Sequence, residues 1–243
     1  MPDHGELYAR ILVPGLFAPF APRLVELADC PPGGALLDVA CGTGVVARAV
    51  ADAGCGRVVG LDASPGMLAH VSGEGVEWVE GDAAALPFPD ASFDAVTCGF
   101  GLMFFPRPVA ALAEMRRVLR PGRHLAASVW CGLEENPAIA ALAAVLRQVA
   151  GERSSRVIPL AFGMGDAGAL EWLAERSGLH DVAVRREVRE ARFASAAELA
   201  LPYTVALDDP EAAHAALAAE LEERLGSGPL AFPVAALLVS ARG

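Results

Sequence analysis

Residues 36–46, with the sequence LLDVACGTGVV, constrain the fold more than any other part of the chain. The apolar residues around Asp38 are typical of a buried strand, and a turn with two glycines follows them. Gly42 and Gly44 allow a tight turn and a close approach of the backbone to a ligand. From Val45 the sequence favours a helix, whose first turn has unpaired N–H groups and the positive end of the helix dipole. The segment therefore predicts a nucleotide-type pocket, without saying which nucleotide it binds.

Strand and helix patterns alternate along the first half of the chain. The predicted strands are residues 35–40, 57–61, 76–80, 93–98 and 123–130. The predicted helices between them are residues 45–53, 65–71 and 109–119. Farther along, the patterns predict two more strands and a helical stretch between them, at residues 182–193, 234–239 and 195–228. This alternation is typical of an α/β fold with a parallel sheet and helices on both faces.

The composition limits the class of protein. A chain of 243 residues suits one α/β domain, and its hydrophobic content of 54% allows a large core. The net charge of −11 and the isoelectric point near 4.9 argue against a nucleic-acid partner, because phosphate binding needs clustered Lys and Arg. The five cysteines form no CxxC pair and have no histidine at ligand spacing, so no metal site is predicted. Their odd number favours a reducing compartment, the cytoplasm.

Residues 11–21, ILVPGLFAPFA, are apolar enough to resemble the core of a signal peptide. The preceding residues lack the positive charge of such a leader, and the segment alone is too short to span a membrane. Pro14 and Pro19 are expected to break up any helix there. We interpret the segment as a hydrophobic flap or helix near a pocket, and we expect no membrane span.

Asp62 ends the second predicted strand, eighteen residues after Gly44. An acid at this place in a βαβ unit faces the ribose hydroxyls of a bound nucleotide and can accept two hydrogen bonds from them. Residues 42–47, GTGVVA, also satisfy the G-x-G-x-x-G/A pattern of NAD-binding proteins. The glycine turn and the acid therefore do not decide which cofactor the chain binds.

The segment after the third predicted strand separates the alternatives. Its sequence is GDAAALPFPDASFDAV at residues 81–96, and it accompanies DVACGTG at 38–44, VVGLDASPGML at 58–68 and ALAEMRRVLRPG at 111–122. In this order the motifs resemble the class I S-adenosylmethionine-dependent methyltransferases. They are most similar to the ubiquinone/menaquinone-biosynthesis group (methyltransferase type 11). The resemblance extends over residues 34–130.

The resemblance implies a Rossmann-like sheet of seven strands, six parallel and the seventh antiparallel, with helices on both faces. We expect a single methyltransferase domain over residues 1–243. Residues 34–130 would form its cofactor-binding half. The segments that would form a lid over the acceptor are residues 1–30, 131–165 and 195–228.

The resemblance also assigns the parts of an S-adenosylmethionine site, with S-adenosylhomocysteine as the product. The residues that it places at the methionyl end are Asp38, Ala40, Cys41, Gly42 and Gly44. Asp62 would bind the ribose hydroxyls, and the residues around the adenine would be Ala63, Met67, Asp82 and Ala83. Cys98 begins a segment, residues 98–103, that would face the sulfonium and the acceptor. The chain contains no lysine, which suits a cationic ligand without a phosphate. Cys41 and Cys98 are expected to be small buried residues, not nucleophiles.

Ligands of open α/β sheets bind outside the carboxyl ends of the parallel strands, so the lid segments should face that edge. The side chains expected to line the acceptor site there are Phe17, Phe20, Met103, Phe104, Phe105, Trp130 and Tyr203. The predicted catalytic residues are His214, as a general base, and Tyr8. The aromatic side chains as a set favour a small apolar or aromatic acceptor.

The sequence therefore predicts methyl transfer from S-adenosylmethionine to such an acceptor by a cytoplasmic monomer or homodimer. The same fold and cofactor could instead serve a non-methylating reaction such as a cyclisation, since a fold does not determine the chemistry. An NAD-dependent oxidoreductase and a non-catalytic binding subunit are further alternatives.

Overall fold

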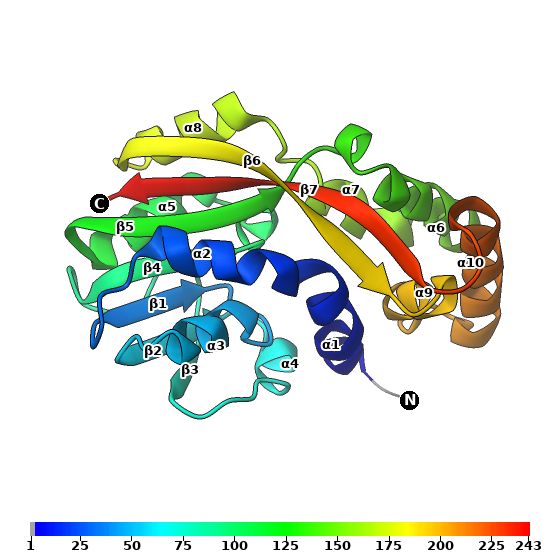
Figure 1. The fold of residues 1–243 in the computed structure, drawn as a ribbon, viewed down its shortest axis with the longest axis horizontal. Coiled ribbons are helices and arrows are strands. Elements are labelled where there is room, and N and C mark those ends of the chain that lie inside the picture. The colour runs from blue at the N-terminus through cyan, green and yellow to red at the C-terminus, as the bar shows by residue number, and fades with distance from the viewer. Residues whose placement is uncertain (1–2) are drawn as a thin grey trace.

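The computed structural model describes residues 3–243, and its strands form one seven-stranded sheet in the order β3-β2-β1-β4-β5-β7-β6 (Figure 1). The strands are β1 (Ala35–Val39), β2 (Arg57–Asp62), β3 (Val76–Glu80), β4 (Phe93–Gly99), β5 (Leu119–Trp130), β6 (His180–Phe193) and β7 (Leu230–Arg242). β7 runs antiparallel to both of its neighbours, and the other strands are parallel to one another. The predicted topology is confirmed.

Burial explains why the central strands consist of nearly continuous apolar runs. In β1 and β4 all residues except the one at an end are buried, because helices cover both faces of the sheet. On one face lie α2 (Ala21–Ala28) and α3 (Val45–Asp52), which contact each other. On the other face lie α5 (Pro108–Val118) and α8 (Ala167–Arg176), which also contact each other. The predicted helices are present, although the one at residues 65–71 is shorter, as α4 (Pro65–Leu68).

Four further helices gather at one end of the sheet, beyond the carboxyl ends of β1, β4 and β5 (Figure 1). They are α6 (Pro137–Ser155), α7 (Val157–Ala161), α9 (Ala196–Thr204) and α10 (Pro210–Leu225). β6 and β7 extend beyond the other strands in this direction and carry α9 and α10 between them. Two single turns, η3 (Leu102–Phe104) and η4 (Leu133–Glu135), follow β4 and β5 at the same end.

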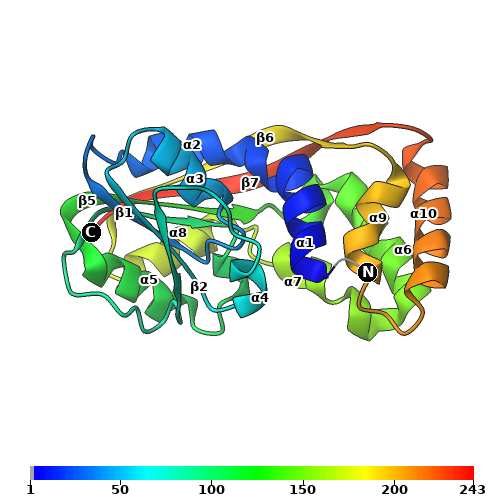
Figure 2. The ribbon, with the colours of Figure 1, turned by 90° about the horizontal axis from the view of Figure 1, so that it is seen from below.

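The N-terminal segment is helical throughout and reaches the same end of the sheet. It comprises α1 (His4–Leu7), the π-helical η1 (Tyr8–Phe17), η2 (Ala18–Phe20) and α2. Figure 2 shows α1 between the sheet and the pair α9 and α10. Met1 and Pro2, the first residues of the predicted lid segment 1–30, lie outside the described residues.

The predicted break at Pro14 and Pro19 is wrong. A proline has no N–H group and its ring clashes with the backbone of a regular α-helix. Here Pro14 lies inside the wider π-helical stretch, where the N–H of Ala18 bonds to the carbonyl oxygen of Val13, five residues earlier. Pro19 lies in the first turn of η2, where no intrahelical N–H bond is needed.

This continuous helix also changes the interpretation of the apolar segment 11–21. Among the described residues, the run His4–Ala28 is long enough, at 25 residues, and apolar enough to cross a membrane by length and composition. Half of its most apolar window is buried inside the protein. One such helix near the N-terminus is a weak indication of a membrane span, because a buried core helix has the same composition.

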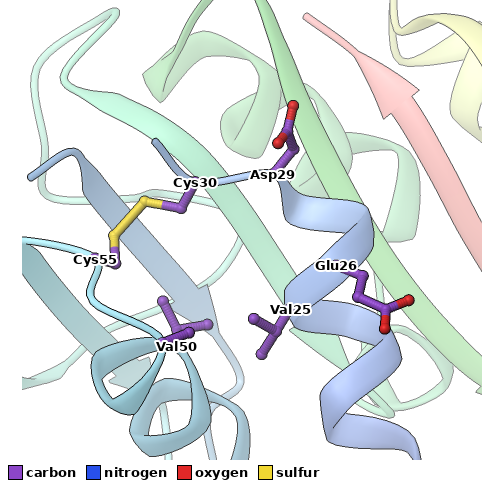
Figure 3. Close-up of a pocket in the computed structure, with 7 residues that line it drawn as sticks. Val25, Glu26, Asp29, Cys30, Val50 and Cys55 are labelled. Atoms are coloured by element: carbon purple, nitrogen blue, oxygen red, sulfur yellow. A yellow bond between two sulfur atoms is a disulfide. The ribbon is translucent and has the colours of Figure 1, made fainter. Parts of the chain in front are cut away.

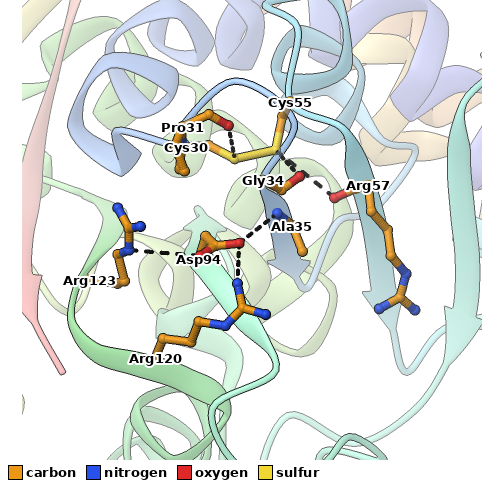
Figure 4. Close-up of a disulfide and its surroundings, with 9 residues drawn as sticks. All are labelled: Cys30, Pro31, Gly34, Ala35, Cys55, Arg57, Asp94, Arg120 and Arg123. Carbon is orange, nitrogen blue, oxygen red and sulfur yellow. Dashed lines mark hydrogen bonds and ion pairs between the residues drawn. A yellow bond between two sulfur atoms is a disulfide. The ribbon is translucent and has the colours of Figure 1, made fainter.

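Two cysteines form a disulfide that the sequence analysis does not anticipate. Cys30, after α2, is joined to Cys55, before β2, with a Cα–Cα distance of 6.1 Å (Figure 4). They lie 25 positions apart in the sequence, so no short spacing marks the pair. The number of cysteines therefore no longer supports a reducing compartment, and the cytoplasmic location stays a prediction.

Beside the disulfide, Asp94 holds the amino ends of three strands together (Figure 4). Its carboxylate accepts a hydrogen bond from the backbone N–H of Ala35, at 3.0 Å, and pairs with Arg120 and Arg123. Burial opposes the ionisation of Asp94, but the hydrogen bonds from Arg120 and Ala35 and the two positive charges outweigh it, so its pKa lies below the usual range.

Candidate active site at the carboxyl ends of β1, β2 and β4

The turn after β1 has a backbone that ordinary residues rarely adopt. Ala40, Gly42 and Gly44 all have a left-handed φ, of +55°, +56° and +88°. The N–H of Gly44 closes the turn on the carbonyl oxygen of Cys41 at 2.8 Å. A Cβ atom at Gly44 would lie 2.3 Å from the ring of Trp78, so only glycine fits there. A Cβ atom at Gly42, in contrast, would meet no residue other than Tyr8 within 4 Å in the part of the chain that the structure describes.

Asp38 stabilises this turn through its buried carboxylate. Its side chain is 1% exposed, and its carboxylate accepts hydrogen bonds from the N–H of Ala47 at 3.0 Å and the hydroxyl of Thr97 at 2.7 Å. Burial raises the pKa of Asp38 to about 7, although both hydrogen bonds lower it. Through these two hydrogen bonds the carboxylate of Asp38 holds the start of α3 next to the end of β4.

Asp62 lies at the end of β2, as predicted, and is turned toward the glycine loop. One carboxylate oxygen accepts the N–H of Gly42 and the other accepts the N–H of Ser64, each at 2.8 Å. These bonds hold the carboxylate at the edge of the turn, where it keeps lone pairs for further donors. Asp62 therefore connects the turn after β1 to the start of α4.

Thr43, between the two glycines, lies in the predicted turn, but the sequence analysis gives its side chain no role of its own. It is 2% exposed, and its hydroxyl is a buried polar atom without a hydrogen-bond partner in the described residues. An orphaned hydroxyl of this kind is uncommon in folded proteins and indicates a partner from outside the chain. Its position within the glycine turn is the only sequence signal that could have pointed to it.

These features fit the methionyl and ribose parts of S-adenosylmethionine. The open space above Gly42, the orphaned hydroxyl of Thr43 and the carboxylate of Asp62 lie within one turn and its neighbouring strand end. Hydroxyl and carboxylate groups suit the polar atoms of such a ligand, and no cation is needed because it has no phosphate.

The residues predicted around the adenine lie on two neighbouring segments. Ala63 is exposed and Met67 is half-buried in α4, immediately after Asp62. Ala83 is buried beyond β3, whereas Asp82 is exposed and its carboxylate accepts the N–H of Ala84 at 2.8 Å.

Cys41 and Cys98 are both buried, as expected. Burial raises the pKa of the Cys98 thiol to about 12 and also raises that of the Cys41 thiol. Asp38 adds to both shifts. Neither thiol is therefore activated as a nucleophile.

The end of β4 is strained where it meets the predicted acceptor side. Phe100 has a left-handed φ of +56°, and its N–H bonds to the backbone and the side-chain oxygen of Ser128 in β5. A bulky residue in this conformation is unusual and is found mainly at functional sites. The strain turns the Phe100 ring onto Trp130, with ring centroids 4.0 Å apart.

Aromatic rings from four segments meet around this pair. The ring of Phe17 lies 5.2 Å from Tyr8, 5.4 Å from Phe100 and 5.5 Å from Trp130. We call this group the aromatic wall, and its members are Tyr8, Phe17, Phe20, Phe100, Trp130 and Phe162. Phe100 and Phe162 are members that the sequence analysis misses. Phe20 and Trp130 are almost completely buried, so they support the wall from behind.

The other predicted acceptor residues lie around this wall. Met103 is buried in η3, whereas Phe104 is 48% exposed and has no ring contact among the described residues. Phe105 is half-buried. Tyr203 lies on α9, which contacts the N-terminal helix that carries Tyr8.

His214 lies in a groove of about 420 Å³ between η1, α9 and α10. Its Nε2 atom is 2.9 Å from the carbonyl oxygen of Ala197. Arg10 and Glu198 line the same groove. A contact with a backbone carbonyl holds the imidazole in place, and its role as a base stays a prediction.

A second hollow, of about 160 Å³, lies beside the disulfide between α2 and α3 (Figure 3). Val25 and Val50 face each other across it (Figure 3). Cys30 and Cys55 precede β1 and β2, so this hollow is near the amino ends of the strands. The hollow therefore lies at the edge of the sheet opposite the carboxyl ends of the strands, where a ligand of the glycine turn would bind.

Comparisons with known proteins agree with the geometry. Residues 37–127 match the family described as "Methyltransferase domain". The chain is 48% identical over 104 residues to the demethylmenaquinone methyltransferase of Renibacterium salmoninarum. The aligned residues cover 42% of this chain and 44% of that protein. The chain thus matches less than half the length of this curated relative.

Solved structures share the fold over most of the chain. An S-adenosylmethionine-dependent methyltransferase from Mesorhizobium loti is 23% identical, with a TM-score of 0.53, and covers 91% of this chain and 96% of its own. The [4+2]-cyclase SpnF is 22% identical, with a TM-score of 0.59, and covers 93% of this chain and 80% of its own. At these identities the likeness shows the fold alone. Residues 37–127 thus match the methyltransferase domain family, the fold is that of solved S-adenosylmethionine-dependent methyltransferases, and the matched segment is similar to a demethylmenaquinone methyltransferase.

Proposed function

We propose that this protein transfers a methyl group from S-adenosylmethionine to a small aromatic acceptor of the quinone or quinol type. The observation that carries the proposal is the position of the aromatic wall. Tyr8, one of its members, lies 3.9 Å from the place of a Cβ atom on Gly42, so the wall borders the glycine turn directly. A flat apolar molecule against the wall would meet a ligand held by that turn.

The proposed cofactor site consists of the turn after β1 and the ends of β2, β3 and β4. Thr43 and the backbone of Gly42 would hold the methionyl end, and Asp62 would bind the ribose hydroxyls. The residues proposed around the adenine and the sulfonium remain Ala63, Met67, Asp82, Ala83 and Cys98. When bound, S-adenosylmethionine supplies a methyl group that its positive sulfonium already activates.

The chain itself then has to align the acceptor and exclude water. Proximity and orientation can lower such a barrier by about 7–11 kcal/mol. Phe17 and Tyr8 present accessible surface for the acceptor, while the buried rings of Phe20 and Trp130 hold them in position. The N-terminal helix and α9 would close the site from solvent.

The acceptor class is supported by the name of a relative. The protein from Renibacterium salmoninarum is a demethylmenaquinone methyltransferase, but the match extends over less than half of either chain. The acceptor side is formed by α6, α7, α9 and α10, which lie outside the matched family segment. The aromatic wall supports an aromatic acceptor independently of that name.

Of the two predicted catalytic residues, we propose a hydrogen-bonding role for Tyr8. Burial raises the pKa of its phenol, and the nearby Tyr203 and Asp62 raise it further. A phenol that keeps its proton can donate a hydrogen bond but cannot act as a base. His214 remains the proposed base for acceptors that must lose a proton.

The cofactor is tested by calorimetry with S-adenosylhomocysteine. We expect micromolar binding by the natural chain and at least a hundredfold weaker binding by Asp62→Ala, because charge-assisted hydrogen bonds to the ribose are lost. The exposed Glu171 on α8 provides the control Glu171→Ala, which should bind as the natural chain does. Binding of NAD in place of S-adenosylhomocysteine would refute the assignment.

The reaction is tested by uptake of labelled methyl groups from S-adenosylmethionine. Naphthoquinols, simple phenols and amines form the acceptor panel, and we expect uptake by the naphthoquinols. The cyclase SpnF shares the fold, so a non-methylating reaction remains the second candidate. Tight binding of S-adenosylhomocysteine without methyl uptake by any acceptor would favour that candidate.

A further inference from the structure

The chain contains two tyrosines, and both lie beside the proposed acceptor site. Tyr8 is in η1 and Tyr203 is in α9, two elements in contact with each other. Both side chains pack against the main hydrophobic core, yet both keep some accessible surface. They are therefore placed at a boundary between the core and a space that another molecule can reach.

Within residues 3–243, neither phenol hydroxyl is a buried atom left without a hydrogen-bond partner, so both oxygens are open to a partner from outside the chain. Of the hydroxyls at these strand ends, that of Thr97 donates to Asp38 and that of Ser128 accepts the N–H of Phe100, whereas that of Thr43 has no partner in the described residues. Polar groups in such packed surroundings are normally paired with protein, water or a ligand. Partners of the phenols are thus expected in the adjoining space.

Both phenols are hydrogen-bond donors at neutral pH. Burial raises the pKa of Tyr203 and of Tyr8 above the usual value. Asp62 is near enough to raise the pKa of Tyr8 further by its negative charge. A neutral phenol in these surroundings suits an uncharged oxygen that accepts a hydrogen bond, and a carboxylate would be repelled by Asp62.

The apolar neighbour of Tyr8 is the aromatic wall. From Tyr8 it continues through Phe17 to Phe100, at centroid distances of 5.2 Å and 5.4 Å. A ligand that fits both features has a flat aromatic body and oxygen atoms at its edge.

We propose that Tyr8 and Tyr203 form a hydroxyl clamp that donates hydrogen bonds to ring oxygens of the methyl acceptor. The clamp selects quinols and hydroxylated aromatic rings over hydrocarbon rings of the same shape. The inference rests on the proposed function, because it assigns two specificity residues to that reaction. It adds the oxygen substituents as the feature that the site recognises.

The test compares 1,4-dihydroxynaphthalene, kept reduced with ascorbate under argon, with 1,4-dimethylnaphthalene, which has the same shape and no oxygen. Dissociation constants are measured for the protein saturated with S-adenosylhomocysteine. The variants are Tyr8→Phe, Tyr203→Phe and the double variant, each of which removes only hydroxyl oxygens. The control is Ser92→Ala, which removes a hydroxyl that bonds to Pro89 before β4, at the opposite edge of the sheet.

We expect the natural chain to bind the dihydroxy compound about tenfold more tightly than the dimethyl compound. Each tyrosine variant should weaken binding of the dihydroxy compound about fivefold, as for one neutral hydrogen bond. Binding of the dimethyl compound should stay within twofold in every variant, and Ser92→Ala should change neither constant.

Fluorine NMR gives a second readout. With 3-fluorotyrosine in place of tyrosine the protein has two fluorine signals, and each single variant identifies one of them. Both signals should shift on addition of the dihydroxy compound, and much less on addition of the dimethyl compound.

The outcomes separate the clamp from the proposed function. Failure of the natural chain to bind S-adenosylhomocysteine overturns the proposed function. Normal cofactor binding with equal affinity for both naphthalenes, or with unchanged affinity in the tyrosine variants, overturns the clamp alone. A fivefold loss of S-adenosylhomocysteine binding in Tyr8→Phe, without a loss for the dihydroxy compound, assigns Tyr8 to the cofactor and also overturns the clamp.

Discussion

Asp38 offers a direct test of how the glycine turn is stabilised. The substitution Asp38→Asn replaces a buried carboxyl by an amide of the same shape. The amide oxygen can accept the N–H of Ala47, as the carboxylate does at 3.0 Å, and the NH₂ group can donate to the oxygen of Thr97. The variant should therefore fold, and the difference from the natural chain should depend on pH.

The magnitude follows from the pKa of Asp38. Burial raises it from 3.8 to about 7, and a shift of about three units corresponds to roughly 4 kcal/mol. Because the folded-state pKa is above the unfolded one, the contribution to stability is full below pH 3.8. It is lost as the pH rises to about 7. An asparagine does not titrate, so Asp38→Asn should become more stable relative to the natural chain by up to about 4 kcal/mol between pH 4 and pH 8.

The assay is urea unfolding at pH 4, 5, 6, 7 and 8, followed by tryptophan fluorescence. Asp94→Asn serves as a control of opposite sign. The pKa of Asp94 is lowered, so this variant should lose stability at neutral pH and approach the natural chain in acid. A constant difference between Asp38→Asn and the natural chain from pH 4 to pH 8 would mean that Asp38 is ionised throughout, and the argument from burial would fail.

Three further substitutions test other parts of the structure. Ala40→Gly should raise the free energy of unfolding by about 1 kcal/mol, because the φ of +55° costs alanine but not glycine; a decrease in urea unfolding would contradict this. Cys30→Ser should lower the free energy of unfolding by about 3 kcal/mol without reductant, since the disulfide joins residues 25 positions apart in the sequence. Dithiothreitol should lower the stability of the natural chain to the same value, and no effect of the reductant would disprove the pairing. Asn136→Ala should lower the free energy of unfolding by about 3 kcal/mol. The buried amide donates to the carbonyl oxygens of Cys131 and Gly132 and accepts the N–H of Ala235 at 2.8 Å, and the variant loses these bonds. A melting temperature within a degree of the natural value would refute this prediction.

The sequence by itself determined the central sheet and the positions of the glycine turn and of Asp62 at the strand ends. Buried strands such as β1 and β4 consist of local apolar runs, and the turn between β1 and α3 needs glycine at fixed positions. Asp62 could be placed because the end of a parallel strand adjoins the turn of its neighbour. These features depend on residues close together in the sequence.

Only the tertiary structure decided which distant residues meet. Cys30 pairs with Cys55 because α2 returns to the amino end of β2, and no spacing in the sequence shows this. The N-terminal helix continues through Pro14 because a π-helical turn shifts its hydrogen bonds. The aromatic wall and the pair Tyr8 and Tyr203 combine segments from both ends of the chain. Such contacts arise from packing between elements, which local patterns do not encode, and the proposed acceptor site depends on them.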